Sequence, residues 1–272
     1  MIWIVTDNTN DLPQSMIDEH QIQVVPLHLT DDMDRRIEIE YDEMLERMAK
    51  WEMFKTSLPS PGQFLETYDR IFEQDSEAEI VVITIASGIS GTNGSANTAV
   101  PLCKHPDKVH VYDSGTSSLA LGLLVLKVAE MAKSGSGFSE IDAFLQERID
   151  KTFIVFIVSD IRYLERTGRV SHMASIIGSL IKLKPILHSR HKEIHLRKMV
   201  LGTKKALKEL VRIVQEEPVL DRRIGITTAG PWHRQELIDA LKDRFELIVS
   251  NMNPILTAHG GPGVASVNFI LE

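Results

Sequence analysis

The sequence contains a single cysteine, Cys103, among 272 residues. One cysteine cannot form a disulfide within the chain, which favours a reducing compartment. The segment around Cys103 predicts a helix end, where a buried space-filling thiol is favoured over a nucleophile. The 10 histidines include no H-E-x-x-H pattern, and Cys103 has no cysteine partner. We therefore expect neither a metal nor any other cofactor.

Strongly basic stretches and long apolar runs are also missing. Lys and Arg total 30 against 38 Asp and Glu, a net charge of -8, which argues against a nucleic-acid partner. The longest apolar stretch, residues 119–129, contains Gly122 and Lys127 and is too short to span a bilayer. The first residues, Met1 to Asp7, predict a buried strand rather than a signal peptide. We expect a cytoplasmic protein with no stable membrane insertion.

Strands and helices alternate through the first half of the chain, the pattern of a parallel α/β sheet. The run 79–85 is almost continuously apolar and β-branched, which is typical of a strand buried on both faces. Ser60 followed by Pro61 predicts a helix start. Strands are expected at 2–6, 22–29, 79–85 and 109–112, with helices at 13–20, 41–51, 61–73 and 118–133.

The pattern changes after about residue 152 and predicts a mixed-sheet α+β half. We expect one domain over residues 1–152 and a second over 153–272. The expected strands are 153–158, 186–187, 194–199, 224–228, 247–251 and 264–271, with helices at 161–164, 173–181, 204–216 and 232–245.

Three segments are unusually rich in Ser, Thr and Gly, and we expect each of them to be a loop. Two of these loops lead into a helix, where unpaired backbone N–H groups stabilise an anion. Neighbouring hydroxyls add donors without adding charge. Ordinary turns and helix caps have the same composition, so one such loop alone would decide nothing. The segments are 56–61 (TSLPSP), 87–92 (SGISGT) and 257–263 (TAHGGPG).

Neither a phosphate-binding loop nor a nucleophile elbow is present in complete form. G-x-x-x-x-G-K-[ST] is absent, G-x-G-x-x-G does not follow the first strand, and the second glycine of a G-x-S-x-G motif around Ser90 comes one residue early.

Two single residues are further candidates for a site. Arg169 could pair with a carboxylate or phosphate of a ligand, or it could lie in solvent or pair with Glu165. His259 has small neighbours, so we expect it to face a ligand or the surface rather than the core.

The order of these segments along nearly the whole chain resembles the DegV family. The start of the chain and residues 182–187 fit the same pattern. The segments that carry the resemblance are Asp7-x-Thr9-x-Asp11-Leu12, Thr56-Ser57-x-Pro59-Ser60-Pro61, Ser87-Gly88-x-Ser90-Gly91-Thr92, Asp160-x-x-Tyr163-Leu164-x-Arg166-x-Gly168-Arg169-x-Ser171, Lys182-x-Lys184-Pro185-Ile186-Leu187 and His259-x-Gly261-Pro262-Gly263; the chain departs from the family at Asn8, Asn93, Ala258 and Gly260.

The resemblance implies a two-domain DegV-like (EDD) fold with a long-chain fatty acid held in a tunnel between the domains. It implies a carrier rather than an enzyme, which presents the carboxylate to a fatty acid kinase, an ATP-binding partner, for phosphorylation to an acyl phosphate. Arg169 and Thr257 would face the head group and the kinase. The carboxylate would be held by Thr56, Ser57, Ser90, Gly91, Thr92 and His259.

An acyl tail of about 16 carbons, at roughly 0.8 kcal/mol per buried CH₂, contributes on the order of 12 kcal/mol before ordering costs. This requires a long apolar channel. The predicted helix 173–181 mixes small and large apolar residues and offers Ile176, Ile177 and Leu180 as tunnel wall, or is ordinary core.

Two enzymatic readings compete with the carrier. One is a serine-dependent acyl hydrolase that uses Ser90 and His259, although no Asp is obviously placed to orient the histidine. The other is a domain related to the dihydroxyacetone kinases, against which the missing phosphate loop and acidic metal cluster argue.

Overall fold

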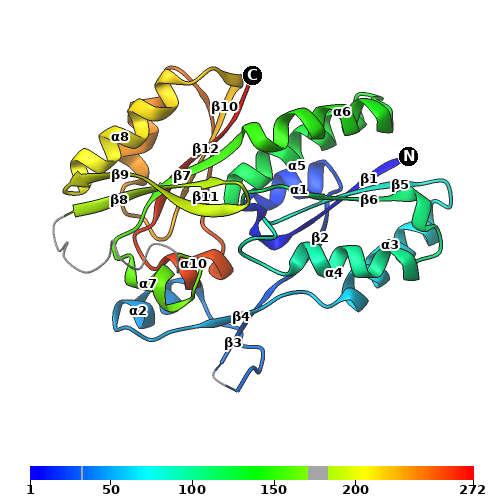
Figure 1. Cartoon of the computed structure of the whole chain (residues 1–272), viewed down its shortest axis with the longest axis horizontal. Helices are drawn as coiled ribbons and strands as arrows, with labels where there is room; N and C mark the ends of the chain where they lie inside the picture. The colour runs from blue at the N-terminus through cyan, green and yellow to red at the C-terminus, as the bar shows by residue number, and fades with distance from the viewer. Residues whose placement is uncertain (32, 171–182) are drawn as a thin grey trace.

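The computed structural model describes residues 1–31, 33–170 and 183–272. The described chain forms two large β-sheets, one in each half of the sequence (Figure 1). The first sheet is wholly parallel, with strand order β2-β1-β5-β6. Its strands are β1 (Ile2–Asp7), β2 (Gln23–Val25), β5 (Glu79–Thr84) and β6 (Val109–Asp113).

Helices cover both faces of the parallel sheet. Side chains alternate along a strand, so Ile80 and Val82 of β5 pack with α3 and α4, whereas Val81 and Ile83 pack with α5. Ser60 caps α3 and forms a capping box with Gln63, which confirms the predicted helix start. The helices are α1 (Gln14–Glu19), α3 (Pro61–Gln74), α4 (Thr92–Ala99), α5 (Ser118–Lys133) and α6 (Phe138–Arg148); short 3-10 turns occupy Asn8–Asn10, Val100–Leu102, Pro106–Lys108 and Ile149–Lys151.

The segment between β2 and α3 leaves the parallel sheet and packs on the second half of the chain. It contains the antiparallel pair β3 (His28–Thr30) and β4 (Lys55–Ser57) with α2 (Tyr41–Ala49) between them. Its apolar side chains share a cluster with Tyr163, Ile255 and Ala258. The prediction of one strand over 22–29 is wrong: Pro26 separates β2 from β3, because proline has no N–H to donate to a sheet.

The second sheet is mixed, with strand order β11-β10-β12-β7-β8-β9. β10 and β11 run parallel, and the other neighbours are antiparallel. Apolar residues of α8 and α9 join the core on one face of this sheet. The strands are β7 (Thr152–Ile157), β8 (Leu183–Arg190), β9 (Glu193–Leu201), β10 (Val219–Thr228), β11 (Glu246–Asn251) and β12 (Ala265–Leu271); the helices are α7 (Arg162–Arg166), α8 (Thr203–Glu216), α9 (Arg234–Leu241) and α10 (Pro254–Gly260).

Helix α5 contacts strands of both large sheets, β1 and β5 on one side and β7, β10 and β12 on the other. The approach to the second sheet is close: a Cβ at Gly225 would lie 2.5 Å from the Cβ of Leu119. A Cβ at Gly122 would lie 2.3 Å from the backbone oxygen of Asn10. Glycine is therefore required at both positions for α5 to fit between its neighbours.

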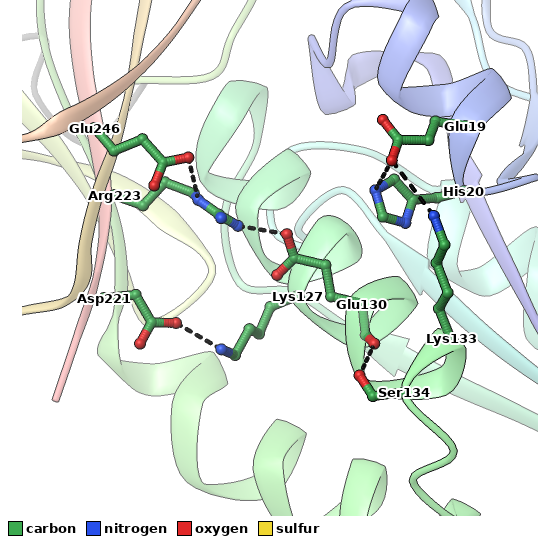
Figure 2. A network of polar contacts seen from close by, with 9 residues as sticks. All are labelled: Glu19, His20, Lys127, Glu130, Lys133, Ser134, Asp221, Arg223 and Glu246. Atoms are coloured by element: carbon green, nitrogen blue, oxygen red, sulfur yellow. Dashed lines mark hydrogen bonds and ion pairs between the residues drawn. The ribbon is translucent and has the colours of Figure 1, made fainter.

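Charged side chains extend the contacts of α5 to both halves (Figure 2). Lys127 pairs with Asp221 at 2.5 Å, and Arg223 bridges Glu130 at 2.7 Å and Glu246 at 3.1 Å. Toward the first half of the chain, Glu19 of α1 lies 3.4 Å from Lys133 of α5 and 3.9 Å from His20. At the end of α5, the Ser134 hydroxyl donates to the Glu130 carbonyl at 2.5 Å. Ion pairs that remain partly exposed contribute little stability each.

The expected division into a parallel first half and a mixed second half is confirmed. The four strands of the parallel sheet precede Thr152, and the six of the mixed sheet follow from it; the domain boundary at 152 stays a prediction. Three further expectations fail. The helix predicted over 232–245 covers only α9, because His233 has a positive φ of 69° and α9 ends at Leu241. The segments predicted as loops at 56–61 and 257–263 begin inside β4 and α10.

Candidate ligand-binding site

A cavity lies between the two halves and is lined by both. Together with its open mouth, the cavity encloses about 800 Å³ of space. Most of its wall is apolar, and it draws on β4, the β5–α4 and β6–α5 loops, β7, α7, the β8–β9 turn and α10. The apolar lining residues are Leu27, Ile85, Ala86, Ile89, Ile154, Phe156, Leu164, Ile194, Met252, Ile255, Leu256 and Val264.

Two of the predicted site residues meet at this cavity through a direct hydrogen bond. Thr56 Oγ1 lies 3.0 Å from His259 Nε2. Thr56 is fixed by the pairing of β4 with β3, where it faces Leu29. His259 lies in the last turn of α10, whose start is set by the Asn253 side chain capping the N–H of Ile255 and by Pro254 at the first helical position.

The environment of His259 keeps its imidazole neutral. Burial and the nearby charge of Arg169 lower the pKa of His259 to about 3. Its Nδ1 atom is buried and has no hydrogen-bond partner within the described part of the chain. A neutral imidazole has one N–H donor and one acceptor nitrogen, so the Thr56–His259 pair can offer a hydrogen bond to a ligand without carrying charge itself.

Arg169 supplies the positive charge at the cavity. It is half-buried, and burial lowers the pKa of its guanidinium, although arginine remains charged at neutral pH. Nη1 donates to the Thr167 carbonyl at 2.5 Å. Within residues 1–31, 33–170 and 183–272, the pairing with Glu165 considered from the sequence is not found, and the guanidinium is bonded to a backbone carbonyl.

Ser90 also lines the cavity, on the loop that follows β5. Its Oγ lies 2.8 Å from Thr92 Oγ1 and accepts the Thr92 N–H at 3.3 Å. This loop is close to the segment that carries Thr56, because a Cβ at Gly91 would lie 3.1 Å from the Leu58 side chain. The two hydroxyl-rich loops predicted from the sequence are therefore neighbours.

Four predicted site residues lie outside the described cavity wall. Ser57 follows Thr56 in β4 and is paired with His28. Gly91 contacts Leu58, and Thr92 is fully buried at the start of α4. Thr257 is buried and faces Tyr41, whose OH lies 3.1 Å from Thr257 Oγ1. Ile176, Ile177 and Leu180, predicted as tunnel wall, lie outside the described residues.

A second polar group at the cavity was not predicted. Thr116 Oγ1 and Ser189 Oγ lie 3.0 Å apart, and Ser189 Oγ also accepts the Ile154 N–H at 3.3 Å. Lys192, in the β8–β9 turn, pairs with Asp113 at 3.0 Å. These contacts close the β8–β9 turn against the first half of the chain. In the sequence, the hydroxyl-rich run 114–118 after a predicted strand could have indicated this polar group. Ser189, the partner of Thr116, is 73 residues further along the chain and no local pattern connects the two.

The hydrogen bonds do not assemble the hydrolase considered from the sequence. A serine nucleophile needs its hydroxyl within reach of the histidine, and the histidine needs an acid that orients it. Ser90 Oγ is bonded within its own loop, and His259 Nε2 is bonded to Thr56. In residues 1–31, 33–170 and 183–272, no carboxylate is bonded to His259 Nδ1, so the arrangement suits binding better than acyl transfer.

Among the described residues, no group of three or more His, Cys, Asp or Glu side chains could hold a metal ion. No helix of the described chain is both long enough and apolar enough to cross a membrane. Cys103 is buried, as expected for a space-filling thiol, and burial raises its pKa.

The fold and the site together define an α/β protein with an apolar cavity between a parallel and a mixed sheet, bordered by neutral hydrogen-bonding groups and one arginine. Comparison with known proteins gives the family. A family model described as "Uncharacterised protein, DegV family" matches residues 1–272. The chain belongs to the DegV family.

Relatives match over nearly their full length. Protein DegV of Bacillus subtilis is 34% identical over 280 residues, which cover 98% of this chain and 98% of the relative. A Thermotoga maritima protein named fatty acid-binding protein is 32% identical over 287 residues, covering 100% of this chain and 97% of the relative. The crystal structure of DegV, described as a fatty acid binding protein from Bacillus subtilis, is similar with a TM-score of 0.86 at 30% identity, covering 100% of this chain and 99% of that one.

Proposed function

We propose that this chain binds one long-chain fatty acid in the cavity between its two halves, with the carboxylate next to Thr56, Ser90, His259 and Arg169. The observation that carries the proposal is the Thr56–His259 hydrogen bond at the edge of an apolar cavity. Two similar proteins are named for fatty acid binding. A mainly apolar wall with a few polar groups suits a ligand with one polar end.

The tail supplies most of the binding free energy in this proposal. Each buried CH₂ contributes roughly 0.8 kcal/mol, so about 16 carbons contribute on the order of 12 kcal/mol before ordering costs. The wall offers this apolar surface from both halves, for example Ile85 and Ile89 from the first and Phe156 and Val264 from the second. Apolar walls from both halves would remove the tail from water on both sides.

The head-group residues favour an ionised carboxylate. Hydrogen bonds to a carboxylate are charge-assisted and stronger than neutral ones. The Thr56 hydroxyl can accept from His259 Nε2 and donate its own proton to the ligand, and Ser90 can add a second donor. Arg169 contributes a positive charge at the cavity.

We further propose that the bound fatty acid is presented to a fatty acid kinase in the cytoplasm. A carboxylate oxygen would attack the γ-phosphorus of ATP held by the kinase. The bond from that phosphorus to the β–γ bridging oxygen breaks, ADP leaves, and an acyl phosphate forms. This chain would act as the carrier, and its own residues would hold the tail and expose the carboxylate. Arg169, which is half-buried, would meet the partner.

The test of fatty acid binding starts from protein purified without added lipid. Organic extraction followed by mass spectrometry should recover about one long-chain fatty acid per chain, and delipidated protein should rebind one equivalent. A protein that yields no acyl chain and binds none on titration with palmitate or oleate refutes the proposal. For the kinase step, acyl phosphate should form only when the carrier, the kinase and ATP are all present.

A further inference from the structure

A buried carboxylate of the first half holds the segment that begins α10. Asp11 Oδ1 accepts the backbone N–H of Asn253 at 2.8 Å, across 242 residues of sequence. Asn253 is the N-cap of α10, and its side chain accepts the N–H of Ile255 at 2.7 Å. Asp11 is thus bonded to the residue that starts the helix bearing His259.

The second oxygen of Asp11 is bonded in the opposite direction, toward the mixed sheet. Oδ2 accepts the Ser118 hydroxyl at 2.6 Å, and Ser118 Oγ lies 2.9 Å from Thr227 Oγ1 of β10. Thr227 is bonded in turn to Ser266 of β12. Ser118, Thr227 and Ser266 are fully buried. One carboxylate therefore connects the parallel half, α5, the mixed sheet and α10.

Each hydroxyl in the series Ser118, Thr227 and Ser266 can donate one hydrogen bond whether Asp11 is ionised or protonated. With the carboxylate ionised, Ser118 donates to Asp11, Thr227 donates to Ser118 and Ser266 donates to Thr227. With Asp11 protonated the direction reverses, and Ser266 can donate to the Thr227 carbonyl, 3.4 Å away. In both states Asp11 Oδ1 can accept from Asn253, but an ionised acceptor forms the stronger bond.

We propose that Asp11 is a positioning residue for the head-group site: it fixes the start of α10, and with it His259, and its protonation sets how firmly that helix is held. The inference rests on the proposed binding of a fatty acid carboxylate beside His259. Asp11 does not line the apolar cavity; it lies in a separate surface pocket with Tyr41 and Asn253, so it acts through α10 and not by touching the ligand.

Other ionisable groups near Asp11 are few in the described chain. Burial raises the pKa of Asp11 to about 7, and the charge of Asp7 on the same segment adds to the rise. Tyr41 of α2 faces Asp11 and is itself influenced by Arg234. Asp18 and Arg70 line the same surface pocket. Among these, Asp11 is the carboxylate bonded to the start of α10.

The test measures hydrogen exchange of the α10 amides in the delipidated protein, as protection factors that remove the intrinsic effect of pH. Asp11→Ala should lower protection over residues 253–259 about tenfold and leave α3 unchanged. The Asn253 N–H lowers the pKa of Asp11, so a local opening of α10 that breaks this bond while Asp11 stays buried is favoured by protonation. In the wild type, protection over residues 253–259 should therefore rise several-fold from pH 6 to pH 8. Asp11→Asn, which keeps the shape and removes the titration, should abolish this rise.

Asp18→Asn is the matched control, because it removes one carboxylate from the same pocket without a bond to Asn253; its α10 protection should equal that of the wild type. Equal protection of α10 in wild type and Asp11→Asn at both pH values would overturn the inference, even if Asp11→Ala fails to fold. Both Asp11 variants should also bind palmitate several-fold more weakly. If the wild type binds no fatty acid but the exchange result holds, the proposed function fails and the positioning role of Asp11 stands.

Discussion

The Thr56 hydroxyl and the His259 imidazole are 203 residues apart in the chain and 3.0 Å apart in the structure. One belongs to the segment that leaves the parallel sheet, and the other to a helix of the second half. Their contact exists only when the β3–α2–β4 segment is packed against α10, so this polar part of the cavity is assembled by the tertiary fold.

Thr56→Val should weaken fatty acid binding about tenfold, because it keeps the volume of the side chain and removes one hydroxyl, with a net cost of about 1–1.5 kcal/mol. Thr56→Ser, which retains the hydroxyl, should bind nearly as well as the wild type. Titration of delipidated protein with palmitate gives both values. Unchanged affinity in Thr56→Val would mean that the hydroxyl does not contact the ligand.

His259→Gln should change how stability depends on pH. The folded-state pKa of His259 is about 3, below its ordinary value of 6.5, so between these values the unfolded chain binds a proton that the folded chain does not. Stability from this group is therefore complete above pH 6.5 and is lost as pH falls toward 3. At pH 4.5 the loss should be at most about 2 kcal/mol, since the side chain is not fully buried.

The effect of His259 is separated from other titrations by comparing urea unfolding of wild type and His259→Gln at pH 7 and pH 4.5. Asp11, with a raised pKa of about 7, contributes with the opposite sign, but it is present in both proteins and cancels in the difference. A wild-type protein that loses no more stability than His259→Gln on acidification would contradict the neutral, buried imidazole.

Affinity should rise with the length of the acyl tail and then level off. Each added CH₂ that is buried should strengthen binding about fourfold, equivalent to roughly 0.8 kcal/mol. Isothermal titration with saturated fatty acids of increasing length measures the slope and the length at which the cavity is full. An affinity independent of tail length would show that the apolar wall does not contact the ligand.

Arg169→Ala should leave fatty acid affinity largely intact and lower acyl phosphate formation with a fatty acid kinase by more than about tenfold. The reason is that the tail supplies most of the binding free energy. A half-buried cation at the head group would instead stabilise the negative charge of the phosphoryl group as it is transferred from ATP to the carboxylate. Arg169→Lys, which keeps the charge, should recover part of the rate. Unchanged phosphorylation in Arg169→Ala would reject this role.

Much of the fold followed from local sequence pattern. The apolar run at 79–85 became the central strand β5 with both faces covered, and Ser60-Pro61 became the start of α3. These features depend on residues adjacent in sequence. The strand predicted over 22–29 failed because the apolar pattern outweighed Pro26, and the loop predicted at 257–263 failed because its glycines outweighed the cap formed by Asn253 and Pro254.

The site was less accessible to sequence reasoning. Thr56, Ser90, Arg169 and His259 were recognised as candidates, and the structure places all four at one cavity. The bond that joins Thr116 to Ser189 and the bond from Asp11 to Asn253 were not expected, because no local pattern records a pairing between distant segments. Such contacts are set by the packing of the two halves against α5.

The most direct measurement of the central claim is ¹³C NMR of palmitate labelled at the carboxyl carbon, titrated into delipidated protein. One bound carboxyl resonance should appear, saturate at one equivalent per chain, and shift or broaden in Thr56→Val while remaining in place in the distant variant Asp239→Asn. A labelled carboxyl that shows no bound resonance, or a bound resonance insensitive to the change at Thr56, would contradict a fatty acid held at the Thr56–His259 pair.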